Sequence, residues 1–148
     1  MGGDMRSRLG VLCAIFIGLL LISAVPALAD IRIERIRFDP PGDDDGSNAS
    51  LNREVIRIEN TGQEAARLRG WMIHTAGHLV FYFPRFRLAG GEAVTIHSGE
   101  GDATRRHLYW NLTIYAWDND AGAATLFDHR MQEIDTCSYQ GGGGSVTC

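Results

Sequence analysis

The sequence predicts an all-β fold, a two-sheet antiparallel sandwich, and three observations support this prediction. Short runs rich in β-branched and aromatic residues recur along residues 31–139. Gly, Asn, Asp and Pro, the residues that favour turns, separate these runs. No segment after residue 30 repeats its apolar residues with the 3.6-residue period of an amphipathic helix. About eight or nine short strands in roughly 110 residues are typical of a sandwich.

The expected strands follow one another along the chain, and each ends at a turn signal. In the first strand the apolar alternation changes phase between Ile33 and Ile36, which indicates a β-bulge. The loop over residues 39–48 is too rich in Pro, Gly and Asp for regular structure. The remaining apolar runs lie at residues 55–59, 68–73, 79–83, 86–88, 93–96, 108–110, 124–127 and 134–139.

Residues 1–29 have the features of a cleavable secretory signal peptide, which we expect to be helical. Arg6 and Arg8 precede an apolar run over residues 11–25, and Ala27 and Ala29 are the small residues that signal peptidase requires. A helix over this apolar run would rise about 22 Å, less than the ~30 Å hydrocarbon core of a bilayer. We therefore expect no permanent membrane span, and a secreted, extracellular protein that begins at Asp30.

The sequence divides into a signal peptide at residues 1–29, one sandwich domain at 30–139 and a glycine-rich C-terminal tail at 140–148. Cleavage would remove two arginines and one aspartate from fourteen basic and eighteen acidic residues, which leaves a net charge of −5. An acidic chain is repelled by phosphate backbones, so we expect no nucleic-acid partner.

Cys137 and Cys148 are the two cysteines that remain after cleavage. We expect them to form a disulfide, because thiols oxidise outside the cell. The glycine-rich segment between them can bend without strain. The bridge is expected to fold the tail back onto the strand that contains Cys137, without linking distant strands. Two free thiols on a frayed tail are the alternative.

Five segments of the chain, in the right order, resemble the signature of the lamin tail domain family. This family is an immunoglobulin-like sandwich found on nuclear lamins and on many exported bacterial proteins. The resemblance covers most of residues 31–136 and implies the same fold for this chain. Its signature positions are Asn52, Glu54, Asn60 and Gly62, then Gly70 and Trp71, then Pro84, then Gly90, and finally Trp117 and Asn119.

Four of these positions have expected structural roles. Trp71 and Trp117 are candidates for the central core between the two sheets. Gly70 would let the chain pass close beside Trp71. Gly62 ends an Asn-Thr-Gly turn, in which it can take a positive φ.

No residue pattern indicates an enzyme, because the chain has neither a nucleophile elbow nor a phosphate-binding loop. No spacing of carboxylates selects an acid–base pair. Glu54 is expected to form a surface ion pair with Arg57 or Arg69, which would contribute little to stability. His74 and His78 bracket a turn and could approach each other, but they lack the helix and the glutamate of a zinc protease.

The loop over residues 39–45 is the most distinctive polar feature. With loop carbonyls, its carboxylates could supply the several oxygen ligands that Ca²⁺ requires; they belong to Asp39, Asp43, Asp44 and Asp45. The spacing is not that of an EF-hand, and aspartates that cap turns are the simpler interpretation. We therefore expect no cofactor, with calcium as the alternative.

Two functions remain open. The first is an extracellular binding module for a protein or a glycan, and the second is a structural, calcium-stabilised domain of the cell envelope. An exposed aromatic patch formed by Tyr109, Trp110 and Tyr115 would favour the first. Calcium-dependent melting would favour the second.

Overall fold

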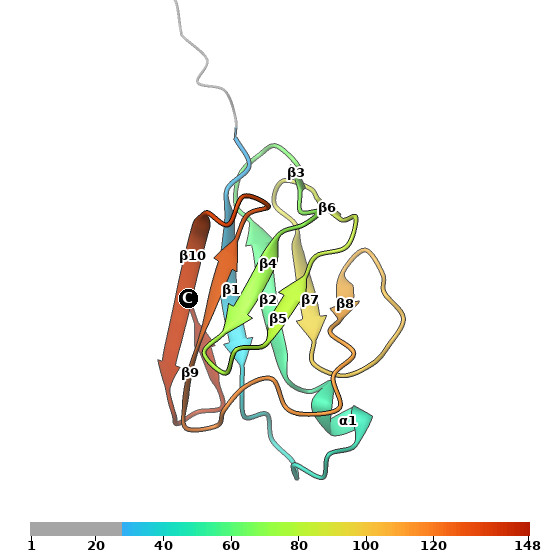
Figure 1. The fold of residues 1–148 in the computed structure, drawn as a ribbon, viewed down its shortest axis with the longest axis vertical. Helices are drawn as coiled ribbons and strands as arrows, with labels where there is room; N and C mark the ends of the chain where they lie inside the picture. Colours follow the sequence, from blue (N-terminus) through green and yellow to red (C-terminus); the bar gives the residue numbers. More distant parts are fainter. Residues whose placement is uncertain (1–27) are drawn as a thin grey trace, which may run out of the picture.

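The computed structural model describes residues 28–148, so the predicted signal peptide lies almost entirely outside the described residues. Eleven strands and one helical turn make up this part of the chain (Figure 1). They are β1 (Ile31–Arg37), α1 (Asn48–Leu51), β2 (Val55–Asn60), β3 (Ala66–Arg67), β4 (Met72–Thr75), β5 (Val80–Tyr82), β6 (Arg87–Leu88), β7 (Ala93–His97), β8 (His107–Tyr109), β9 (Ala121–Phe127), β10 (Glu133–Gln140) and β11 (Ser145–Thr147).

Two main sheets pack into the predicted sandwich. One has the strand order β11-β1-β2-β7-β8 and the other β10-β9-β4-β5, while β3 and β6 form a separate two-stranded ladder. All pairs are antiparallel except β7 with β8, which is parallel. This exception to the predicted antiparallel sheet arises because the loop over residues 98–106 carries the chain back before β8 begins, in place of a tight hairpin.

No helix among residues 28–148 is both long and apolar enough to cross a membrane.

The core lies between the two main sheets and follows the predicted alternation. On β2, Ile56 and Ile58 are fully buried whereas Arg57 between them is exposed. The predicted bulge in β1 is present, because its register with β2 shifts between Ile33 and Arg35. Ile33 and Ile36 therefore both point into the core, as the change of phase required.

The two signature tryptophans differ in depth. Trp117 is 4% exposed and belongs to the central cluster. Trp71 is only partly buried and packs against the outside of that cluster, so the prediction that it lies in the central core was wrong. The centre at this level is occupied by Leu68 and Ile73, each with no exposed surface. Trp71 lies immediately before β4, where the chain is entering the sheet from its end.

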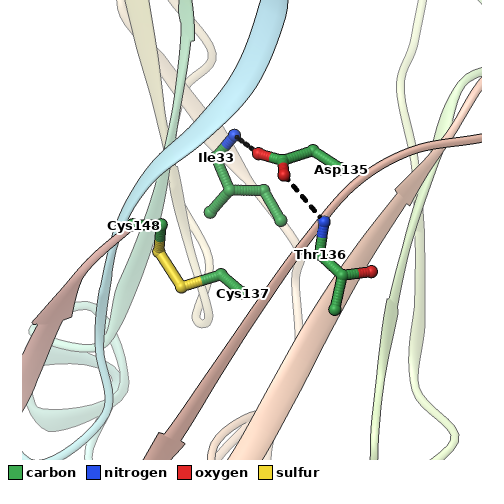
Figure 2. Close-up of a disulfide and its surroundings, with 5 residues drawn as sticks. All are labelled: Ile33, Asp135, Thr136, Cys137 and Cys148. Atoms are coloured by element: carbon green, nitrogen blue, oxygen red, sulfur yellow. Dashed lines mark hydrogen bonds between the residues drawn. A yellow bond between two sulfur atoms is a disulfide. The ribbon is translucent and has the colours of Figure 1, made fainter.

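The C-terminal tail departs from the prediction. Cys137 and Cys148 form the expected disulfide, with their Cα atoms 5.7 Å apart. However, β11 pairs with β1 and not with β10, so the bridge joins the two sheets (Figure 2). The expectation that the tail folds back onto its own strand was wrong. Three glycines with positive φ, at positions 142–144, turn the chain from one sheet to the other, a conformation in which glycine has no side-chain penalty.

A hydrogen bond reinforces the same edge of the sandwich. Asp135 on β10 accepts from the backbone amide of Ile33 on β1 at 2.8 Å and from the amide of Thr136 at 2.9 Å (Figure 2). The amide of Cys148 donates to the Glu34 carbonyl at 2.9 Å. The disulfide and the Asp135 carboxylate therefore act together as links between the two sheets.

Reduction of the disulfide should lower the free energy of unfolding by about 2–3 kcal/mol, because the unfolded chain loses the constraint of a short closed loop. The sandwich should stay folded while β11 separates from β1. Hydrogen exchange and limited proteolysis, before and after reduction, would detect faster exchange and cleavage after residue 140. A double variant, Cys137→Ser/Cys148→Ser, is the control that should be insensitive to reductant. Free thiols in the native protein would contradict this prediction.

Candidate functional site

The ladder of β3 and β6 places four arginines on one surface. Arg67 on β3 lies directly opposite Arg87 on β6 in the register of the pair. Arg69 follows β3 by two residues, and Arg85 precedes Arg87 by two. With Phe86 they line a cleft of about 710 Å³, which we call the arginine cleft. The intervening Leu68 is fully buried, so the period of two along each strand points the arginines outward.

The arginines of the cleft have no carboxylate partner within residues 28–148. The ion pairs in this part of the chain are Arg32–Glu59, Arg57–Glu34 and Arg105–Glu92. Like charges directly opposite each other on a ladder destabilise it. An anion bound between the guanidinium groups would remove this repulsion, because guanidinium makes paired hydrogen bonds to phosphate, sulfate or carboxylate. The cleft is therefore suited to binding negatively charged groups.

Sequence reasoning missed this site. Its signal is the repeated Arg-x-Arg, at residues 67–69 and 85–87, with an apolar residue in the middle of each. Each motif alone is typical of an ordinary strand with one face exposed to solvent. Only the pairing of β3 with β6 brings the two motifs together.

Glu54 is buried, although it was expected to form a surface ion pair. Its side chain is 1% exposed, and its carboxylate accepts from the Ser98 hydroxyl at 3.1 Å and from the Ala116 amide at 2.9 Å. Arg57 pairs instead with Glu34, and Arg69 lies in the arginine cleft. Burial raises the pKa of Glu54 to about 7, even though these hydrogen bonds favour the ionised form. Glu54 thus connects the start of β2 to the segments that follow β7 and β8.

Asn60, another signature residue, organises the end of the sandwich where β1 begins. Its side-chain oxygen accepts from the amides of Asp30 and Gly62, each at 3.1 Å. Its side-chain nitrogen donates to the carbonyls of Glu64 at 2.7 Å and Leu88 at 3.2 Å. The side chain is 1% exposed and satisfies four backbone groups from three separate segments.

The structure exchanges the expected roles of two signature glycines. Gly70 has a φ of +77°, so it is Gly70 that needs the left-handed conformation. Gly62 is not among the positive-φ residues, but a side chain there would collide with the carbonyl of Leu28. A side chain at Gly90 would likewise collide with the Gln63 carbonyl. Gly62 and Gly90 therefore allow neighbouring segments to approach closely.

The remaining signature positions have local structural roles. Asn52 ends α1, and its side-chain nitrogen donates to the Glu100 carbonyl at 2.8 Å. Asn119 donates to Asp44 at 3.1 Å. Pro84 is exposed and lies in the connection between β5 and β6.

Hydrogen bonds within the protein occupy part of the acidic loop. Asp45 accepts from the Ser47 amide at 2.9 Å, and hydrogen bonds from the side chain and amide of Ser47 lower the pKa of Asp45. Ser47 in turn caps α1 by accepting from the Ser50 amide. Asp43 contributes its backbone carbonyl to Ser50, at 3.0 Å. Across the part of the chain that the structure describes, no group of three or more His, Cys, Asp or Glu side chains is arranged to hold a metal ion.

Two of the five histidines contact each other, but they are not His74 and His78. His74 packs against Phe127 with ring centroids 4.8 Å apart, while His78 is exposed in a turn with a φ of +67°. The pair that forms is His97 and His107 on the parallel strands β7 and β8, whose ring nitrogens lie 2.9 Å apart. The sequence did not indicate this contact, since a parallel pairing leaves no local signal.

The three aromatic residues whose exposure would have favoured a binding module have partners inside the protein. Trp110 meets Trp117 edge-on at 6.2 Å. Tyr109 stacks on His97 at 4.9 Å. The Tyr115 hydroxyl lies 2.7 Å from the Ser50 hydroxyl. All three are only partly exposed, and they therefore support the end of the sandwich that carries α1.

The two packed β-sheets define this molecule as a β-sandwich domain, and the arginine cleft lies on its surface. The sequence matches the family model of the Lamin Tail Domain over residues 24–141. The chain therefore belongs to the lamin tail domain family, which is a family of non-enzymatic immunoglobulin-like domains. No curated protein matches the chain.

Proposed function

We propose that this chain is an exported, non-catalytic binding module that captures clustered anionic groups in its arginine cleft. The observation that carries the proposal is the placement of four arginines without carboxylate partners around one cleft of residues 28–148. The mature chain is acidic overall, with a net charge of −5 after the predicted cleavage. A concentration of positive charge without an ion-pair partner among the described residues costs stability, so ligand binding is a physical reason for its presence.

The arginine cleft is better suited to binding a ligand than to catalysing a reaction. The four arginines are exposed and remain charged at any physiological pH, so they cannot exchange protons with a substrate. Glu54, whose pKa burial raises to about 7, accepts hydrogen bonds from Ser98 and Ala116 and is not among the residues that line the cleft. An extracellular partner for this module would present phosphate, sulfate or carboxylate groups.

The double variant Arg67→Gln/Arg87→Gln should bind an immobilised sulfated polysaccharide about tenfold more weakly than the wild type. Exposed charge pairs contribute between about 0.2 and 1 kcal/mol, so the loss of two at about 0.7 kcal/mol each gives this factor. The measurement is retention on dextran sulfate as a function of salt. The matched control is Arg35→Gln/Arg37→Gln, which removes two exposed arginines of β1 that lie outside the cleft. Equal losses in both variants would show that net charge, and not the cleft, determines binding.

Export should yield a secreted protein whose first residue is Asp30, because Ala27 and Ala29 satisfy the signal peptidase. Intact-mass measurement of the culture medium tests this. A mass that includes residues 1–29, found in a membrane fraction, would contradict it. The control is Ala29→Arg, which should block cleavage and raise the mass accordingly.

A further inference from the structure

The arginine cleft and the acidic loop lie at opposite ends of the sandwich. Strands β3 and β6, whose arginines line the cleft, lie at the end of the sandwich where the chain enters β1 (Figure 1). The opposite end, beside α1, carries the acidic loop and the turn before β9, which the hydrogen bond between Asn119 and Asp44 holds together. The aspartates of that end are Asp39, Asp43, Asp44, Asp45, Asp118 and Asp120.

The chain begins at the cleft end. Leu28, the first residue that the structure describes, is 72% exposed, and its carbonyl packs against Gly62. The Asp30 amide is bound by Asn60, which also holds the Leu88 carbonyl at the end of β6. The first described residues therefore enter the sandwich on the side of the arginine cleft.

We propose that the arginine cleft docks onto the anionic headgroups of a phospholipid surface, with the β3–β6 end toward the bilayer. This inference rests on the proposed function, and it names the partner as a membrane. The cleft is open, and its four arginines are exposed, which suits an extended array of phosphates better than one small ligand. Guanidinium groups can bind lipid phosphates through paired hydrogen bonds.

The acidic end of the sandwich does not prevent this docking. A seven-residue strand such as β1 spans about 23 Å. The Debye length at physiological ionic strength is about 8 Å, so repulsion from the acidic end is largely screened when the cleft touches the surface.

The test is cosedimentation of the exported protein with phosphatidylcholine vesicles, prepared with and without phosphatidylglycerol. The wild type should bind only the anionic vesicles. Arg67→Gln/Arg87→Gln should bind about thirtyfold more weakly, which is the factor for two arginines close to an anionic surface. Arg35→Gln/Arg37→Gln, which removes the same charge elsewhere, should bind less than about threefold more weakly.

A second pair of substitutions tests the orientation. Asp43→Asn/Asp120→Asn changes the net charge by two at the far end, where neither side-chain carboxylate accepts a hydrogen bond within residues 28–148. Vesicle binding should change by less than about threefold, because these groups lie beyond the Debye length. A strengthening as large as the loss in the cleft variant would overturn the proposed orientation.

The vesicle result and the polysaccharide result separate the two proposals. If dextran sulfate retains the protein through the cleft but anionic vesicles do not bind it, the membrane inference is wrong and the proposed function stands. If neither surface binds the wild type, both proposals fail. If soluble dextran sulfate displaces vesicle-bound protein, the same cleft serves both ligands, as the inference requires.

Discussion

Replacing Trp117 with alanine should lower the free energy of unfolding by about 3–5 kcal/mol, the largest effect we expect from a single substitution. Trp117 is 4% exposed and lies in the central cluster, where it meets Trp110 edge-on. Alanine would leave a cavity that the two sheets cannot close without moving. Since a typical domain has only about 5–15 kcal/mol of stability, the variant should be severely weakened. Urea denaturation of the purified protein measures this difference.

Trp71→Ala is the matched comparison, because it removes the same side chain from a shallower position. From the sequence alone, both tryptophans were expected in the central core. The structure places Trp71 outside the central cluster and only partly buried, so its replacement should cost less than that of Trp117. If Trp71→Ala is the more damaging of the two, the depth assigned to these rings is incorrect.

The stability of the wild type should fall as the pH rises from about 5 to 7 and then level off, with Glu54 as the cause. The ordinary pKa of a glutamate is 4.5, and burial raises that of Glu54 to about 7. Between these values the folded protein keeps the proton that the unfolded chain has already lost. Stability is therefore fully present below the unfolded pKa and is lost as the pH rises through the folded pKa. The shift corresponds to a loss on the order of 3 kcal/mol.

Glu54→Gln should abolish this pH dependence, because the neutral amide cannot ionise. Its oxygen can still accept from Ser98 and Ala116, so the variant is expected to fold. Denaturant titrations between about pH 5 and 8 would compare how steeply the free energy of unfolding of the two proteins changes with pH. Glu64→Gln, which changes an exposed glutamate, should retain the slope of the wild type. A slope that persists in Glu54→Gln would assign the effect to another group.

The all-β sandwich could be predicted from the sequence because its evidence is local. Alternation such as that of Ile56, Arg57 and Ile58 shows which face of a strand is buried, whatever that strand pairs with. The bulge in β1 is a change of phase within one strand, and it was predicted for the same reason. The disulfide partners could be predicted without knowledge of the structure, since only two cysteines remain in the predicted mature chain. The family resemblance also rests on short segments in order, and the family match confirms it.

The candidate site depends on contacts that no local pattern contains. Arg67 and Arg87 are twenty positions apart, and only the pairing of β3 with β6 places them opposite each other. The two-residue strands of this ladder are too short to show an alternation that could have been recognised. The contact between His97 and His107 depends in the same way on a parallel pairing across a long loop.

The sequence by itself determined the fold class, the disulfide partners and the family of this protein, because alternation, composition and short motifs are properties of neighbouring residues. The tertiary structure alone decided that β11 joins the opposite sheet, that Glu54 is buried and that Trp117 lies deeper than Trp71. It also decided that four arginines share one cleft. Depth and proximity depend on which strands pair and how the sheets stack, and these outcomes arise from the packing of the whole chain.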